Sequence, residues 1–146
     1  MRDDGVGSRV VKAIESSLME HNISSLVGET DVQCCFHEIK QDDLLIIIDA
    51  MDQSKKPGSV DVMLLRDAIK HRGKLRTQHE FSLFDLIELH YPKIQGIFIG
   101  IEAAEIGFGF ELSKPLQKCF QKICTDVLTK ILKFKEEAEH ARYSPD

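Results

Sequence analysis

Residues 42–52, DDLLIIIDAMD, contain five consecutive apolar residues at positions 44–48. Apolar residues that do not alternate with polar ones predict a strand with both faces buried, as in the middle of a parallel sheet. A second run of this kind occupies residues 97–101 within IQGIFIGIEA. Residues 60–65, VDVMLL, alternate well enough to predict a strand that is covered more on one side.

The segments before and after these strands have the apolar spacing of helices. Near the start of the chain, apolar residues recur at the spacing of an amphipathic helix: Val6, Val10, Ala13, Ile14 and Leu18. Asp3 or Asp4 is placed to cap the N-terminus of this helix. NISSLVGET predicts a weak strand, and DVQCCFHEIK predicts a short helix.

Two further helices are predicted on either side of the second apolar run. Thr77 and Glu80 have the T-x-x-E spacing of a capping box, with an inner stripe that consists of Leu83, Leu86 and Ile87. Ser113 is placed as the N-cap of the last helix, with Pro115 in its first turn. One face of that helix carries Leu116, Phe120, Ile123, Val127, Leu128 and Ile131.

Strands that alternate with helices predict an α/β fold with three layers, in which helices flank a twisted, mainly parallel sheet. The chain of 146 residues fits one globular domain. We place this domain at residues 1–134, followed by a polar tail, residues 135–146, that frays into solvent.

Charge and composition argue against two classes of partner, nucleic acids and membranes. The net charge is −5 and the basic residues are scattered, which argues against binding of nucleic acid. No apolar run approaches the roughly 20 residues that cross a bilayer, so we expect no membrane segment. The 4 cysteines form no C-x-x-C motif, and we interpret them as reduced thiols of a cytoplasmic protein.

Three polar residues fall where an open α/β sheet binds ligands, beyond the carboxyl ends of its strands. Asp49 ends the first apolar run, Asp4 stands at the start of the first helix, and His79 lies in the first turn of the capped helix. Two carboxylates and one imidazole suit a divalent transition metal, and three ligands leave positions open for water or a partner's ligand. Each residue also has a simpler interpretation, namely a helix cap, a turn cap and a surface histidine, and both remain open.

Other kinds of site have less support in the sequence. The GVG of residues 5–7 is not G-x-G-x-x-G and follows no strand, so a dinucleotide-binding loop is not predicted. The serine pairs at residues 16–17 and 24–25 lie in no strand–turn–helix setting for a nucleophile.

Five stretches follow one another in order: DDGVG (residues 3–7), LLIIIDAMD (44–52), KKPG (55–58), HEFSLFDL (79–86) and IFIGIEAAEIGFGFELS (97–113). Together they resemble the hydrogenase maturation proteases, the endopeptidases that trim the large subunit of nickel–iron hydrogenases. The resemblance extends from Asp3 to about Ile131. It implies a twisted α/β sheet with a single metal-binding crevice.

The resemblance also implies which residues bind the metal. The family's ligands are an acid in D-[DE]-G-x-G, the aspartate that ends the Ile-Ile-Asp-Ala strand and a histidine before a helix. These positions are Asp4, Asp49 and His79 here. Nickel, supplied by the immature large subunit, is the expected metal, although another divalent metal is expected to substitute in vitro. The family has no dedicated serine or cysteine nucleophile.

The resemblance further implies a strand ending in Gly-x-Gly-Asn before the acidic motif, whereas this sequence begins at Met1, two residues before Asp3. We interpret Met1 as an internal residue of a longer native protein. The alternative is a decayed or repurposed copy that binds its partner without cutting it.

The leading hypothesis is a cytoplasmic, nickel-dependent endopeptidase that removes a C-terminal peptide from the precursor of a hydrogenase large subunit. The alternatives are a non-catalytic, metal-sensing docking protein for the same precursor and a small flavodoxin-like binding module.

Overall fold

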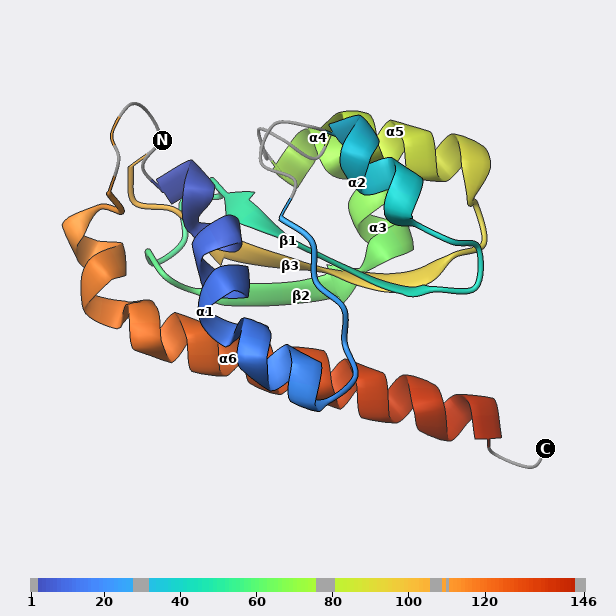
Figure 1. Cartoon of the computed structure of the whole chain (residues 1–146). Coiled ribbons are helices and arrows are strands. Elements are labelled where there is room, and N and C mark those ends of the chain that lie inside the picture. Colours follow the sequence, from blue (N-terminus) through green and yellow to red (C-terminus); the bar gives the residue numbers. More distant parts are fainter. Residues whose placement is uncertain (1–2, 28–31, 76–80, 106–108, 110, 144–146) are drawn as a thin grey trace.

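The computed structural model describes residues 3–27, 32–75, 81–105, 109 and 111–143. Figure 1 shows the helices and strands in chain order: η1 (Asp3–Gly5, a short 3-10 helix), α1 (Val6–Glu20), α2 (Val32–Glu38), β1 (Leu44–Met51), β2 (Val60–Leu64), α3 (Leu65–Lys70), α4 (Arg72–Leu75), α5 (Phe81–His90), β3 (Gln95–Glu102) and α6 (Lys114–Tyr143).

The described strands form one sheet in the order β1-β3-β2. β1 and β3 are parallel, with Asp49 opposite Gly100 and Met51 opposite Glu102. β2 is antiparallel to β3. The two apolar strands therefore pair in parallel as predicted, while β2 makes the sheet a mixed one. β1 lies at the edge of the described sheet and not in its middle.

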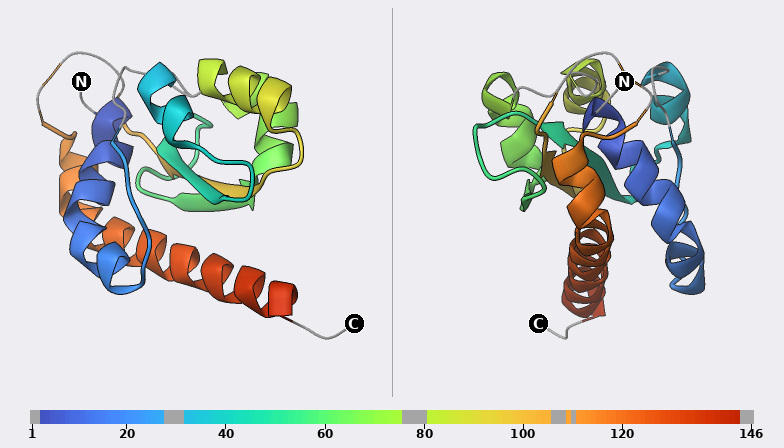
Figure 2. Two further views of the ribbon diagram at one scale, coloured as in Figure 1. Left: turned by 45° about the vertical axis from the view of Figure 1, so that its right-hand side comes forward. Right: turned by 90° about the vertical axis from the view of Figure 1, so that its left-hand side faces the viewer.

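Both faces of this sheet are covered by helices. Successive side chains of a strand point to opposite faces, so β3 contributes to two cores. Ile99 and Ile101 pack with α1 and α6, whereas Phe98 packs with α3 and α5. The right-hand view of Figure 2 shows the three layers, with α1 and α6 below the sheet and α2, α3 and α5 above it. The predicted three-layer α/β fold is confirmed.

The helix α1 forms where the apolar periodicity predicts it. Val6, Val10, Ile14 and Leu18 are buried against the sheet and α6. The prediction that Asp3 or Asp4 occupies the cap position is wrong, because Gly5 is the N-cap residue. The Asp3 carboxylate makes other hydrogen bonds, which are described with the site below.

The helix α6 begins at Lys114, directly after Ser113, as predicted. It continues through residue 134 to Tyr143, so the prediction of a frayed tail is wrong for residues 135–143. Two hydrogen bonds attach this last part to the body: Lys135 Nζ donates to the His21 carbonyl at 2.5 Å, and Arg142 donates to the Asp42 carbonyl at 3.2 Å.

Shorter elements were less predictable. α3 and α4, which have 6 and 4 residues, are too short to show a helical period, and neither is predicted. Residues 22–27, the described part of the predicted weak strand, form no strand. Thr77 and Glu80 of the predicted capping box lie outside the described residues, and α5 is described from Phe81 onward.

Within the described ranges, no helix is both long and apolar enough to cross a membrane. All 4 cysteines belong to the described part of the chain, and none forms a disulfide.

Candidate metal site at the carboxyl end of β1

Asp49 lies near the carboxyl end of β1, with only 5% of its surface exposed. It shares a face of the strand with Ile47 and Met51, which pack in the core on the α3 and α5 side. Its Oδ1 accepts a hydrogen bond from the backbone N–H of Ala50 at 2.8 Å. The structure therefore places the Asp49 carboxylate inside the protein, on the side of the sheet that α5 covers.

The start of α1 is pressed against this end of β1. A Cβ on Gly7 would lie 2.6 Å from the Ile48 carbonyl oxygen and 3.2 Å from the Asp49 Cα. Only a residue without a side chain permits this approach. Because η1 directly precedes α1 and also contacts β1, the backbone of Asp4 is held close to Asp49.

The third predicted ligand precedes α5, which leads into β3 through a short connection. A helix that feeds a parallel strand runs opposite to it, so α5 begins toward the end of the sheet that carries Asp49 (Figure 1). His79 itself and the side chain of Asp4 lie outside the described residues. The structure thus brings Asp49 and the backbone of η1 together, and the convergence of all three side chains remains a prediction.

No metal-binding cluster of three or more histidine, cysteine, aspartate or glutamate side chains occurs among the described residues. Two of the three predicted ligands are not in that set. The described part of the site is therefore Asp49 and the backbone that surrounds it.

Asp3 is a buried carboxylate that the sequence did not distinguish from a helix cap. Its side chain is 0% exposed. Oδ2 accepts hydrogen bonds from the backbone N–H groups of Ala104 and Glu105 and from Ser113 Oγ, each at 2.7 Å. Oδ1 accepts the Ser113 backbone N–H at 2.8 Å. Burial alone would raise the pKa of Asp3, but the hydrogen bonds from Glu105, Ser113 and Ala104 outweigh it and hold the pKa below its usual value.

Glu102 is a second buried carboxylate that sequence reasoning missed. It ends β3, opposite Met51, and is 1% exposed. Its Oε1 accepts the backbone N–H groups of Gln53 at 2.8 Å and Lys55 at 3.0 Å, which holds the turn after β1. A polar residue at the end of an apolar strand was the signal that selected Asp49, and the same signal applies to Glu102.

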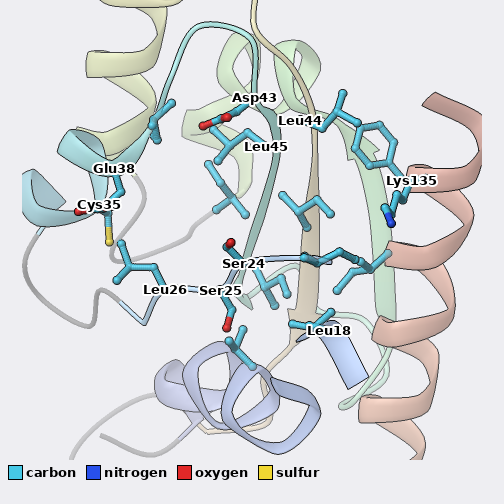
Figure 3. Close-up of a pocket in the computed structure, with 18 of the residues that line it drawn as sticks. Leu18, Ser24, Ser25, Leu26, Cys35, Glu38, Asp43, Leu44, Leu45 and Lys135 are labelled. Atoms are coloured by element: carbon cyan, nitrogen blue, oxygen red, sulfur yellow. The ribbon is translucent and has the colours of Figure 1, made fainter. Parts of the chain in front are cut away.

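A groove of about 780 Å³ follows the outer edge of β1. Figure 3 shows Leu26 on the segment that crosses in front of β1, Glu38 on α2 at one side and Lys135 on α6 at the other. The lining continues along β1 to Asp49 and Gly7. The groove therefore opens onto the end of the sheet that carries the candidate site.

The family model described as HycI, hydrogenase maturation protease, matches residues 8–130. The chain belongs to the hydrogenase maturation protease family. Positions 49 and 79 lie inside the matched range and Asp4 lies four residues before it. A comparison with curated protein sequences gave no match.

Solved structures of hydrogenase maturation proteases share this fold. The [NiFe] hydrogenase maturation protease HybD from Thermococcus kodakarensis is 27% identical, with a TM-score of 0.68 over 90% of each chain. The hydrogenase maturating endopeptidase HybD from E. coli is 18% identical, with a TM-score of 0.70 over 91% of this chain and 86% of that one. The endopeptidase HycI from Escherichia coli is 21% identical, with a TM-score of 0.64 over 86% and 80%.

The family assignment confirms the predicted class of enzyme. Hydrogenase maturation proteases are endopeptidases that process the precursor of a hydrogenase large subunit, and this chain is a protease of that family. The predicted metal ligands, Asp4, Asp49 and His79, remain a prediction.

Proposed function

We propose that this hydrogenase maturation protease is a nickel-dependent endopeptidase. It removes a C-terminal peptide from the precursor of a nickel–iron hydrogenase large subunit. Nickel arrives with the precursor, and Asp4, Asp49 and His79 complete its coordination. The observation that carries the proposal is the buried Asp49 carboxylate at the end of β1, with the first turn of α1 seated against it at Gly7.

The residue types fit such a metal. Two carboxylates and one imidazole suit a divalent first-row metal, and three protein ligands leave positions for groups of the precursor. A metal bound there supplies Lewis-acid chemistry, by polarising a peptide carbonyl or lowering the pKa of a water. The protein's own contribution is to hold its ligands on rigid elements, namely the end of β1 and the short helix that leads into α1.

Cys124 is unsuited to act as a thiolate nucleophile. Cys124 is buried in the core between α6 and the sheet, and burial raises the pKa of its thiol. A thiol with a raised pKa is a poor nucleophile. Because none of the 4 cysteines forms a disulfide, we place the reaction in the reducing environment of the cytoplasm.

The test is to incubate the protein with nickel-loaded and nickel-free precursor and to measure the mass of the large subunit. We expect shortening only with the nickel-loaded precursor. Asp49→Asn and His79→Ala should each abolish it, whereas the matched control His71→Ala should not, because His71 is exposed at the end of α3. A nickel-loaded precursor that keeps its full length would refute the proposal, and association that depends on nickel without shortening would indicate the docking alternative.

A matched pair of glycine variants tests the position of α1 in the same assay. Gly7→Ala would force a Cβ to within 2.6 Å of the Ile48 carbonyl, whereas a Cβ on Gly5 meets nothing within 4 Å. Gly7→Ala should therefore slow processing at least tenfold, because a displacement near 1 Å costs about that much or more. Gly5→Ala should retain nearly full activity. Equal rates for the two variants would show that the seating of α1 against β1 is irrelevant to the reaction.

A further inference from the structure

We propose that Asp3 is a positioning residue for the metal site. Its carboxylate fixes η1 to the segment after β3 and to the start of α6, so that the neighbouring Asp4 supplies the ligand. This inference rests on the proposed function, since it assigns a role to Asp3 only if Asp4 and Asp49 bind a metal.

The Asp3 carboxylate has no capacity left for a metal. Oδ2 accepts three hydrogen bonds and Oδ1 accepts one, all between 2.7 and 2.8 Å. The side chain is 0% exposed. An ionised carboxylate offers about four acceptor sites, and four donors occupy them here. Of the two adjacent aspartates, Asp3 is therefore committed to the protein itself.

The donors come from two segments that are distant from Asp3 in the sequence. Ala104 and Glu105 lie just after the end of β3 at Glu102, and Ser113 directly precedes α6. The backbone adds a further link, because the Asp3 N–H donates to the Glu105 carbonyl at 3.2 Å. Asp3 thus joins η1, the end of β3 and the start of α6 at a single point. We call this set of hydrogen bonds the Asp3 clamp.

The clamp lies one residue from the proposed ligand. Consecutive Cα atoms are 3.8 Å apart, so a fixed Asp3 leaves the backbone of Asp4 little freedom. A second restraint follows at Gly7, whose close approach to Ile48 seats α1 on β1. The backbone of Asp4 is therefore held from both sides, by the clamp before it and by the contact between α1 and β1 after it.

Asparagine cannot replace Asp3 in this arrangement, although it has the same shape. If the amide oxygen takes the place of Oδ2, the amide nitrogen faces the Ser113 N–H; if it takes the place of Oδ1, the nitrogen faces the N–H groups of Ala104 and Glu105. Two donors then oppose each other in either orientation. Asp3→Asn should consequently shift η1 while preserving the volume of the buried side chain.

The test is titration calorimetry of the whole protein with Ni²⁺ alone, at a temperature at which every variant is folded. We expect Asp3→Asn to weaken Ni²⁺ binding at least about tenfold, the usual effect of losing a group that orients a metal ligand. Ile131→Ala is the matched control. The substitution creates a cavity in the hydrophobic core that α6 forms with α1 and the sheet. Residue 131 lies eighteen residues beyond Ser113, which is roughly 27 Å along the helix. Ile131→Ala should lower stability without changing Ni²⁺ affinity, which separates positioning from general destabilisation.

Wild-type affinity in Asp3→Asn would overturn the clamp. If that variant does not fold, Ser113→Ala decides the question, because it removes only the Oγ donor. A loss of about threefold or more supports the inference and an unchanged affinity overturns it. Ni²⁺ binding that requires Asp49 but is indifferent to Asp3 refutes this inference alone. A wild-type protein that binds no free Ni²⁺ refutes this inference, whereas the proposed function, in which nickel arrives with the precursor, is tested separately by the shortening of the large subunit.

Discussion

Two buried carboxylates lie on either side of the segment that follows β3, and they differ in how many hydrogen bonds they accept. Asp3 approaches this segment from the N-terminus and accepts four hydrogen bonds with both oxygens. Glu102 ends β3 itself and accepts two backbone N–H groups with Oε1. Its Oε2 is buried and has no hydrogen-bond partner among the described residues.

The difference concerns what each carboxylate holds in place. Asp3 joins three elements, and its loss would leave the N–H and Oγ donors of Ser113 buried without an acceptor, whereas the donors of Ala104 and Glu105 lie nearer the surface. Glu102 holds a turn whose exposed side carries the ion pair between Lys55 and Asp61. A buried donor without an acceptor costs about 1–3 kcal/mol, whereas a donor near the surface can turn to water. We therefore expect Asp3 to matter more for the fold than Glu102, although both are equally buried.

The largest effect expected is that of Asp3→Ala on the free energy of unfolding. Two buried donors of Ser113 and two part-buried backbone donors lose their acceptor, and a loss of about 3 kcal/mol is expected, a large share of the stability of a domain of this size. Glu102→Ala should cost only about 1–2 kcal/mol, because two donors are affected and an oxygen without a partner is removed. Urea denaturation of both variants measures the two values. An equal or reversed order would contradict the comparison.

The same comparison shows what the sequence was able to reveal. Both apolar runs were recognised as strands, because five apolar residues in a row require cover on both faces, and both cores exist. Such a run does not show whether the strand has a hydrogen-bonded neighbour on both sides or on only one. β1 was accordingly predicted in the middle of a sheet, although it lies at the edge of the described sheet, with the groove of Figure 3 beside it.

The candidate site was predictable only in part. Asp49 was selected because an acid that ends a buried strand is conspicuous. The structure places it in the interior, and its role as a metal ligand stays a prediction. Asp3 was not recognised, because its partners lie 101 to 110 residues away in the sequence. No local pattern predicts hydrogen bonds at such a separation. From sequence alone, a buried clamp and an exposed helix cap look the same in an Asp-Asp-Gly motif.

The dependence of stability on pH gives a second, smaller contrast. The pKa of Asp3 is lowered in the folded protein, so its ionised form stabilises the fold above the unfolded-state value of about 3.9. This contribution is lost as the pH falls through the lower folded-state pKa. The gap in stability between wild type and Asp3→Asn should therefore be widest near neutral pH and should narrow below about pH 4. Thermal unfolding between pH 7 and pH 2 measures it, and a gap that stays constant would show that the charge of Asp3 is not what the four donors require.

The smallest effect expected is that of Glu102→Gln. The amide oxygen can take the place of Oε1 and continue to accept from Gln53 and Lys55. The new NH₂ group would replace Oε2, which has no partner among the described residues, so one poorly satisfied group is exchanged for another. We expect a change in the free energy of unfolding below about 1 kcal/mol, against a clearly larger loss for Asp3→Asn. If urea denaturation finds equal losses for the two amide substitutions, then Oε2 is engaged in solution by a group such as a bound water, and Glu102 is as fully satisfied as Asp3.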